Sequence, residues 1–160
     1  MSDSSSSKCC GSLSYAFAHL LLRLWVGMRL FMAGIDKFRW GNGPTVSFGL
    51  DNYSKKTGPL AKLMADNSFM PQWACDAFAA SIGYILIPVG SWVAIGIFTE
   101  FGLFAAGLVF LSLGLGLAAL PDDTEVVSNI GLSILIVAAA LVTSKAKTFS
   151  LDGLLFRKKA

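Results

Sequence analysis

Three long stretches without a charged residue constrain this chain more than any other feature. They cover residues 77–99, 101–121 and 126–144, each about 20 residues long, which is the length of a helix that crosses a hydrocarbon core of ~30 Å. Residues 13 to about 38 are the fourth predicted span. Because backbone polar groups in a bilayer must bond within the protein, helices are expected rather than an open sheet. The prediction is an all-α protein whose residues 13–144 form a four-transmembrane-helix bundle.

The composition supports a lipid environment and excludes several function classes. Charged residues make up 14% of the chain and mean hydropathy is +0.64, whereas soluble domains carry roughly 25% charged residues. The net charge of +3 comes mainly from the chain ends, which disfavours nucleic-acid binding. Cys9 and Cys10 are adjacent, Cys75 is distant and His19 is the single histidine. We therefore expect no metal site and no intrinsic cofactor.

The remaining segments are polar. Residues 1–12 are Ser-rich and are predicted to be a disordered tail, in which Cys9 and Cys10 are either free thiols or acylation sites. Residues 39–72 form a long extramembrane connection, within which residues 60–64 are expected to lie as a short amphipathic helix on the membrane surface. Residues 145–160 are predicted to be a basic, amphipathic segment at the interface.

Lysine and arginine placement sets the expected orientation. The C-terminal segment is rich in Lys and Arg, whereas the turn at residues 121–129 has none, so the C-terminus should be cytoplasmic. An even number of spans places the N-terminus on the same side. Trp40 and Trp73 then mark the outer interface. The contrary signal is a group of cations in the long connection, namely Arg39, Lys55, Lys56 and Lys62. We expect location in a bacterial inner membrane.

The first span carries charges at mid-membrane depth. At 3.6 residues per turn, Arg23, Gly27, Gly34 and Lys37 share one stripe, while Arg29 and Asp36 share another. Each arginine near a helix centre costs about 2.5 to 3.5 kcal/mol to insert. Both charged stripes are therefore expected to face the bundle interior. The two glycines should let a neighbouring backbone approach closely, and Gly90 with Ala94 offers a matching small-residue contact.

Two roles are open for these charges. In the structural one, Arg29 pairs with Asp36 and Arg23 pairs with Glu100. In the functional role, one arginine keeps hydrogen-bond donors free to bind an anion, a quinone carbonyl or a lipid phosphate. The candidate ligand-binding residues are then Arg23, Arg29, Lys37 and Trp25. Trp25, Tyr84 and Trp92 either line a flat apolar pocket or fill the core. No residue is assigned a catalytic role.

Three sequence elements carry a family resemblance that extends over residues 13–155. The chain resembles the DoxX/DoxD-like membrane proteins, which include the small membrane subunit of thiosulfate:quinone oxidoreductase. The matching elements are Arg23-Leu24, Gly27, Phe31, Gly34 and Lys37, then GIFTE at residues 96–100 and SLDGLL at residues 150–155.

The resemblance implies a four-helix bundle that works with another subunit in quinone reduction or in oxidation of reduced sulfur compounds. Two departures argue against a sulfur-oxidising activity. The family commonly has Arg where this chain has Glu100, and often an acid early in the second helix, where residues 86–89 are apolar here.

The leading hypothesis is a membrane subunit or anchor of a larger complex, with the bilayer and other membrane or peripheral subunits as partners and a quinone as the candidate cofactor. If the complex is a quinone-linked oxidoreductase, this chain is a subunit without a redox centre of its own. The alternatives are a structural or assembly protein without a ligand, or a small solute carrier acting as an oligomer. The carrier is disfavoured because the chain shows neither an inverted repeat nor a pair of broken helices.

Overall fold

The computed structural model describes residues 4–41, 43–68, 70–118 and 126–146. Its backbone is mostly helical, with five helices, so the predicted all-α class is confirmed. The helices are α1 (Ser4–Phe38), α2 (Leu50–Asn67), α3 (Gln72–Ile95), α4 (Thr99–Ala118) and α5 (Leu132–Val142), with short 3-10 or π turns at Gly43–Thr45, Val126–Gly131 and Ser144–Ala146. A small antiparallel hairpin joins β1 (Arg39–Trp40) to β2 (Ser47–Phe48).

Three helices are long and apolar enough to cross a membrane, at Leu13–Phe38, Gln72–Ile95 and Thr99–Leu117. A shorter apolar helix covers Ser128–Val142. The first three predicted spans are thus present as apolar helices, while a fourth complete span stays a prediction. The boundary between the second and third spans lies a few residues earlier than predicted. Gly96 has φ +78°, and this left-handed residue ends α3.

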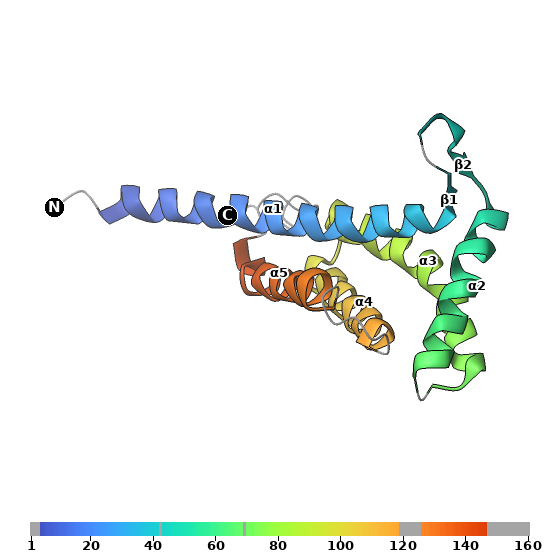
Figure 1. The fold of residues 1–160 in the computed structure, drawn as a ribbon. Helices are drawn as coiled ribbons and strands as arrows, with labels where there is room; N and C mark the ends of the chain where they lie inside the picture. Colours follow the sequence, from blue (N-terminus) through green and yellow to red (C-terminus); the bar gives the residue numbers. More distant parts are fainter. Residues whose placement is uncertain (1–3, 42, 69, 119–125, 147–160) are drawn as a thin grey trace.

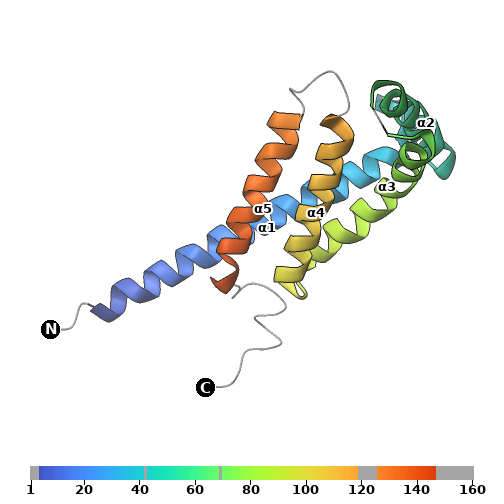
Figure 2. The same ribbon diagram turned by 90° about the horizontal axis from the view of Figure 1, so that it is seen from below.

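The four apolar helices surround one core. Buried side chains from α1, α3, α4 and α5 pack together there, including Leu30, Leu86, Leu103 and Val137. Neighbouring helices contact in the order α1, α3, α4, α5 and back to α1. Figure 2 shows α1 crossing α5 at an angle, and in Figures 1 and 2 the N-terminal part of α1 projects beyond the other helices.

Among the described helices, α1 and α3 approach each other closely through small residues on both helices. A Cβ built at Gly27 would lie 2.8 Å from the backbone nitrogen of Ala94, and one built at Gly90 would lie 2.5 Å from the backbone nitrogen of Phe31. Side-chain atoms do not approach backbone this closely, so only glycine lets the two helices meet at this separation. The predicted small-residue contact is confirmed.

The long connection is more ordered than the sequence suggested. The helix predicted at residues 60–64 is part of the 18-residue α2, which lies against the first half of α3 (Figure 1). Tyr53 anchors it, because the hydroxyl donates to the Ala79 carbonyl oxygen at 2.7 Å and accepts from the Gly83 backbone N–H at 3.1 Å. Burial raises the pKa of the Tyr53 hydroxyl, so the proton needed for donation is retained. Met64 and Ala61 pack on Cys75 and Ala79 below it.

The predictions for the two polar ends of the chain can also be compared with the structure. Residues 1–12 were expected to be disordered, but α1 begins at Ser4. Extending an existing helix adds one hydrogen bond per residue, and this stretch contains no proline to stop it. The predicted basic segment at 145–160, with the SLDGLL element, lies outside the described residues apart from Lys145 and Ala146.

Candidate functional site

The two mid-span arginines of α1 lie in different environments. Arg23 is 3% exposed, whereas Arg29 is exposed on the surface of the chain. Six residues at 100° each turn the second side chain by about 240° relative to the first, so one helix face cannot bury both. The expectation that both charged stripes face inward is therefore confirmed for Arg23 and wrong for Arg29.

Arg23 occupies the C-terminal end of α3. Its guanidinium packs directly on Gly96, where a Cβ would overlap Nη1. Gly96 follows the last turn of α3, where the helix dipole leaves partial negative charge on carbonyl groups. A cation buried at this point is electrostatically favoured. Glycine at position 96 thus ends the helix and also leaves room for the arginine. The predicted pairing of Arg23 with Glu100 stays a prediction.

His19 lies one turn before Arg23 and meets another helix end. Its Nδ1 donates to the carbonyl oxygen of Ala140 at 3.1 Å and lies 3.3 Å from Oγ1 of Thr143. Ala140 belongs to the last turn of α5. The side chain of His19 is 2% exposed, so the imidazole is buried where α1 meets α5. His19 and Arg23 are four residues apart and so lie on one face of α1, where each contacts the C-terminal end of another helix. This spacing was the sequence signal for the shared role.

Arg29 lines a cavity between α1 and the start of the last apolar helix. Its Nη2 donates to Oδ1 of Asn129 at 3.0 Å. The cavity has a volume of about 390 Å³, within the usual range for small-molecule sites. Four polar residues line it, namely Arg29, Asp36, Asn129 and Ser133; the remaining walls are apolar, from Leu30, Met32, Ala33, Leu86, Phe110, Leu113 and Ile130.

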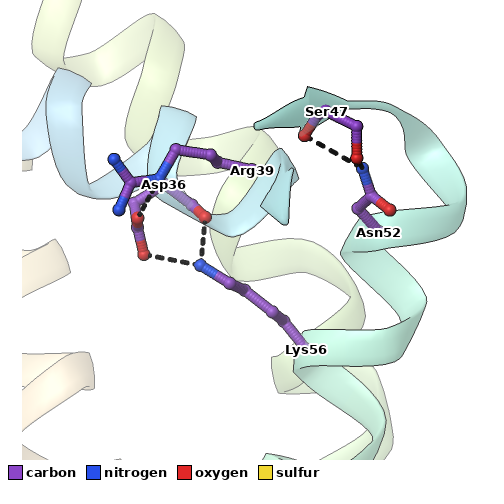
Figure 3. Close-up of polar contacts among 5 residues, drawn as sticks. All are labelled: Asp36, Arg39, Ser47, Asn52 and Lys56. Atoms are coloured by element: carbon purple, nitrogen blue, oxygen red, sulfur yellow. Dashed lines mark hydrogen bonds and ion pairs between the residues drawn. The ribbon is translucent and has the colours of Figure 1, made fainter. Parts of the chain in front are cut away.

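Asp36 pairs with residues other than the one predicted. Its carboxylate lies 3.4 Å from Nε of Arg39 and 2.9 Å from Nζ of Lys56, which also donates to the Asp36 backbone oxygen at 2.6 Å (Figure 3). The predicted ion pair between Arg29 and Asp36 is wrong in the described part of the chain. Asp36 pairs elsewhere because the packing of α2 places Lys56 beside the end of α1, and because Arg39 follows Asp36 by three residues.

The other predicted ligand residues do not join this cavity. Arg23, Lys37 and Trp25 are absent from its lining. Trp25 is 54% exposed. Tyr84 contacts the ring of Phe38 edge-on and the ring of Tyr53 at a tilt, so the flat pocket predicted for Trp25, Tyr84 and Trp92 is not formed by these three together.

Trp92 is held at the turn between α3 and α4. Its Nε1 donates to the carbonyl oxygen of Ile97 at 2.5 Å. A second cavity of about 320 Å³ lies along the contact between α1 and α3, beside Gly27 and Gly90, and its walls are apolar apart from Ser91.

Asn129 and Ser133 are site residues that sequence reasoning missed. The Asn129 side chain accepts from Arg29, while Ser133 donates to the Asn129 backbone oxygen at 2.5 Å. The usable signal was their spacing of four residues at the start of an otherwise apolar helix, which puts both on one face.

Comparisons with protein-family models, with curated proteins and with solved structures found no match. The resemblance to the DoxX/DoxD-like proteins therefore stays a prediction from the sequence elements. Among the described residues, no group of three His, Cys, Asp or Glu side chains is placed to hold a metal ion.

Proposed function

We propose that this chain is a DoxX-like integral membrane protein that binds a quinone head group in the Arg29 cavity and serves as the membrane subunit of a redox complex. The observation that carries the proposal is the position of Arg29, a charged donor in the middle of an apolar helix, beside a cavity of ligand size. The partner subunit would supply the two electrons, and two protons would be taken up, as the quinone becomes a quinol.

The chemistry of the cavity favours a neutral acceptor over an anion. A guanidinium has five N–H donors, and within the described residues Arg29 makes one hydrogen bond, to the neutral Asn129. The same cavity contains the carboxylate of Asp36, which repels a second anion. A quinone carbonyl accepts from the guanidinium without that repulsion. The apolar side chains of Leu30, Leu86 and Phe110 suit its ring.

Binding of a short-chain benzoquinone to the purified full chain tests the proposal. Replacing Arg29 with methionine should weaken binding about 10- to 100-fold, because a hydrogen bond to a charged group contributes about 1.5 to 3 kcal/mol. Equilibrium dialysis in detergent gives the dissociation constant. Trp25→Leu, outside the cavity, should bind as tightly as the unmodified chain.

Asn129→Ala separates this function from a purely structural role. It removes the partner of Nη2 but keeps the guanidinium, so quinone binding should be retained. If Arg29 only ties α1 to the last helix, Arg29→Met and Asn129→Ala should lower thermal stability alike. An unmodified chain that binds no quinone would contradict the proposal, and the structural alternative would then be preferred.

The proposed membrane orientation has both termini in the cytoplasm of a bacterial cell. It is supported by the contact of His19, in the first half of α1, with Ala140 in the last turn of α5, because this contact puts the first half of α1 beside the C-terminal end of α5. A membrane-impermeant maleimide should therefore label a Cys75→Ser variant through Cys9 and Cys10 in inverted membrane vesicles and not in intact spheroplasts. Labelling in spheroplasts would reverse the orientation.

A further inference from the structure

A third cavity lies beside the C-terminal end of α1. It has a volume of about 370 Å³ and is lined by Arg39, Trp40, Gly41 and Lys56. Arg39 directly follows the apolar span that ends at Phe38, so the cavity sits at the level where lipid head groups begin. Trp40 is half exposed there, as expected for an aromatic side chain at an interface.

The charges around this cavity are unbalanced. Among the residues that the structure describes, Arg39 and Lys56 share one carboxylate, that of Asp36 (Figure 3), so this cluster has one more positive than negative charge. The side chains of Arg39 and Lys56 are 49% and 29% exposed. Both can therefore reach an external anion while α2 and the hairpin hold them in place.

Contacts of the β1–β2 hairpin and of α2 fix the positions of Arg39 and Lys56. Arg39 pairs across the hairpin with Phe48, and Trp40 pairs with Ser47. The Asn52 side chain donates to the Ser47 backbone oxygen at 3.1 Å, which joins the hairpin to the first turns of α2. Lys56 lies one turn further along the same helix and donates to the end of α1. Three elements thus converge on one cationic cavity.

We propose that this cavity binds the phosphate of an anionic phospholipid head group. A phosphate oxygen would accept from the guanidinium of Arg39 and the ammonium of Lys56, and Trp40 would lie beside the glycerol region. Asp36 competes with the phosphate for the same two cations. This site is distinct from the Arg29 cavity, and it does not depend on quinone binding.

Spin-labelled lipids provide the test with the full chain in phosphatidylcholine vesicles. Spin-labelled phosphatidylglycerol should associate with the protein more strongly than spin-labelled phosphatidylcholine. The double variant Arg39→Gln, Lys56→Gln should lose this preference, by about fivefold for each cation removed. The matched control is Lys55→Gln, Lys62→Gln, which removes the same charge from exposed positions of α2 outside the cavity and should keep the preference. Equal losses in both double variants would overturn the site, as would no preference in the unmodified chain.

Asp36→Asn should change the lipid preference in the opposite direction from the loss of Arg39 and Lys56. Removing the competing carboxylate should strengthen the preference for phosphatidylglycerol, which no general loss of structure would do. An unchanged or weaker preference would contradict the proposal. Competition with inorganic phosphate distinguishes the two possible sources of the phosphate group. If added phosphate displaces the spin-labelled lipid, the cavity also binds free phosphate. If it does not, the ligand is the lipid head group.

Discussion

Replacing Gly90 with alanine should destabilise the protein by about 3 kcal/mol, the upper end of the usual cost of overpacking. The added Cβ would lie 2.5 Å from the Phe31 nitrogen and 2.8 Å from the Gly27 oxygen. Both atoms belong to the backbone, so no side chain can rotate away. Helices α1 and α3 must separate, and the apolar contact along both is weakened. For a chain of this length the melting temperature should fall by about 10 °C, measured by thermal unfolding in detergent.

Gly107→Ala is the matched control. A Cβ at Gly107, in α4, would lie 3.5 Å from Val137 Cγ1, an ordinary contact distance. The same substitution there should leave stability unchanged or raise it by up to about 1 kcal/mol, because alanine favours the helix. If both variants melt at the same temperature, the close approach of α1 and α3 does not exist.

Replacing Arg23 with glutamate should have a similarly large effect, of about 3 to 5 kcal/mol. The side chain is buried against the C-terminal end of α3, where a cation is favoured and an anion is repelled by the last carbonyl groups. Arg23→Lys, which keeps the charge, should retain most of the stability. The measurement is the yield of monodisperse protein together with its melting temperature.

Arg39→Glu is the comparison for charge reversal at an exposed position. Its side chain is half exposed at the end of α1, so its ion pair should contribute less than about 1 kcal/mol to stability.

The electrostatic account of Arg23 predicts that Arg23→Met is less damaging than Arg23→Glu. The reverse order would contradict it and would indicate that the fit of the long side chain matters more than its charge.

Much of the fold follows from patterns local in sequence. The charge-free runs predicted α3 and α4 to within a few residues, because the length and polarity of a membrane helix are set by the bilayer. Gly27 and Gly34 predicted that another helix backbone approaches α1, and Gly90 with Ala94 predicted a small-residue contact of α3. The structure adds that these two sets of residues meet each other. α2 was predicted only in part, because its position depends on Tyr53 finding Ala79 and Gly83 on another helix.

The candidate site was less predictable than the fold. The cost of Arg29 in the membrane identified it as a candidate site residue, and the structural alternative paired it with Asp36, which lies on the same helix stripe. The partner in the structure is Asn129, 100 residues away in sequence. Spacing along α1 cannot reveal which side chain another helix brings to the same place.

The sequence by itself determined that this chain forms apolar helices, that α1 carries charge into them, and which small residues permit close packing. These properties depend on side-chain type and on helical period, which are local quantities. The tertiary structure decided that Arg23 is buried at the end of α3, that Arg29 borders a cavity and that Asp36 pairs with Arg39 and Lys56. Those outcomes depend on how the helices are rotated and placed against one another, and long-range packing sets that arrangement.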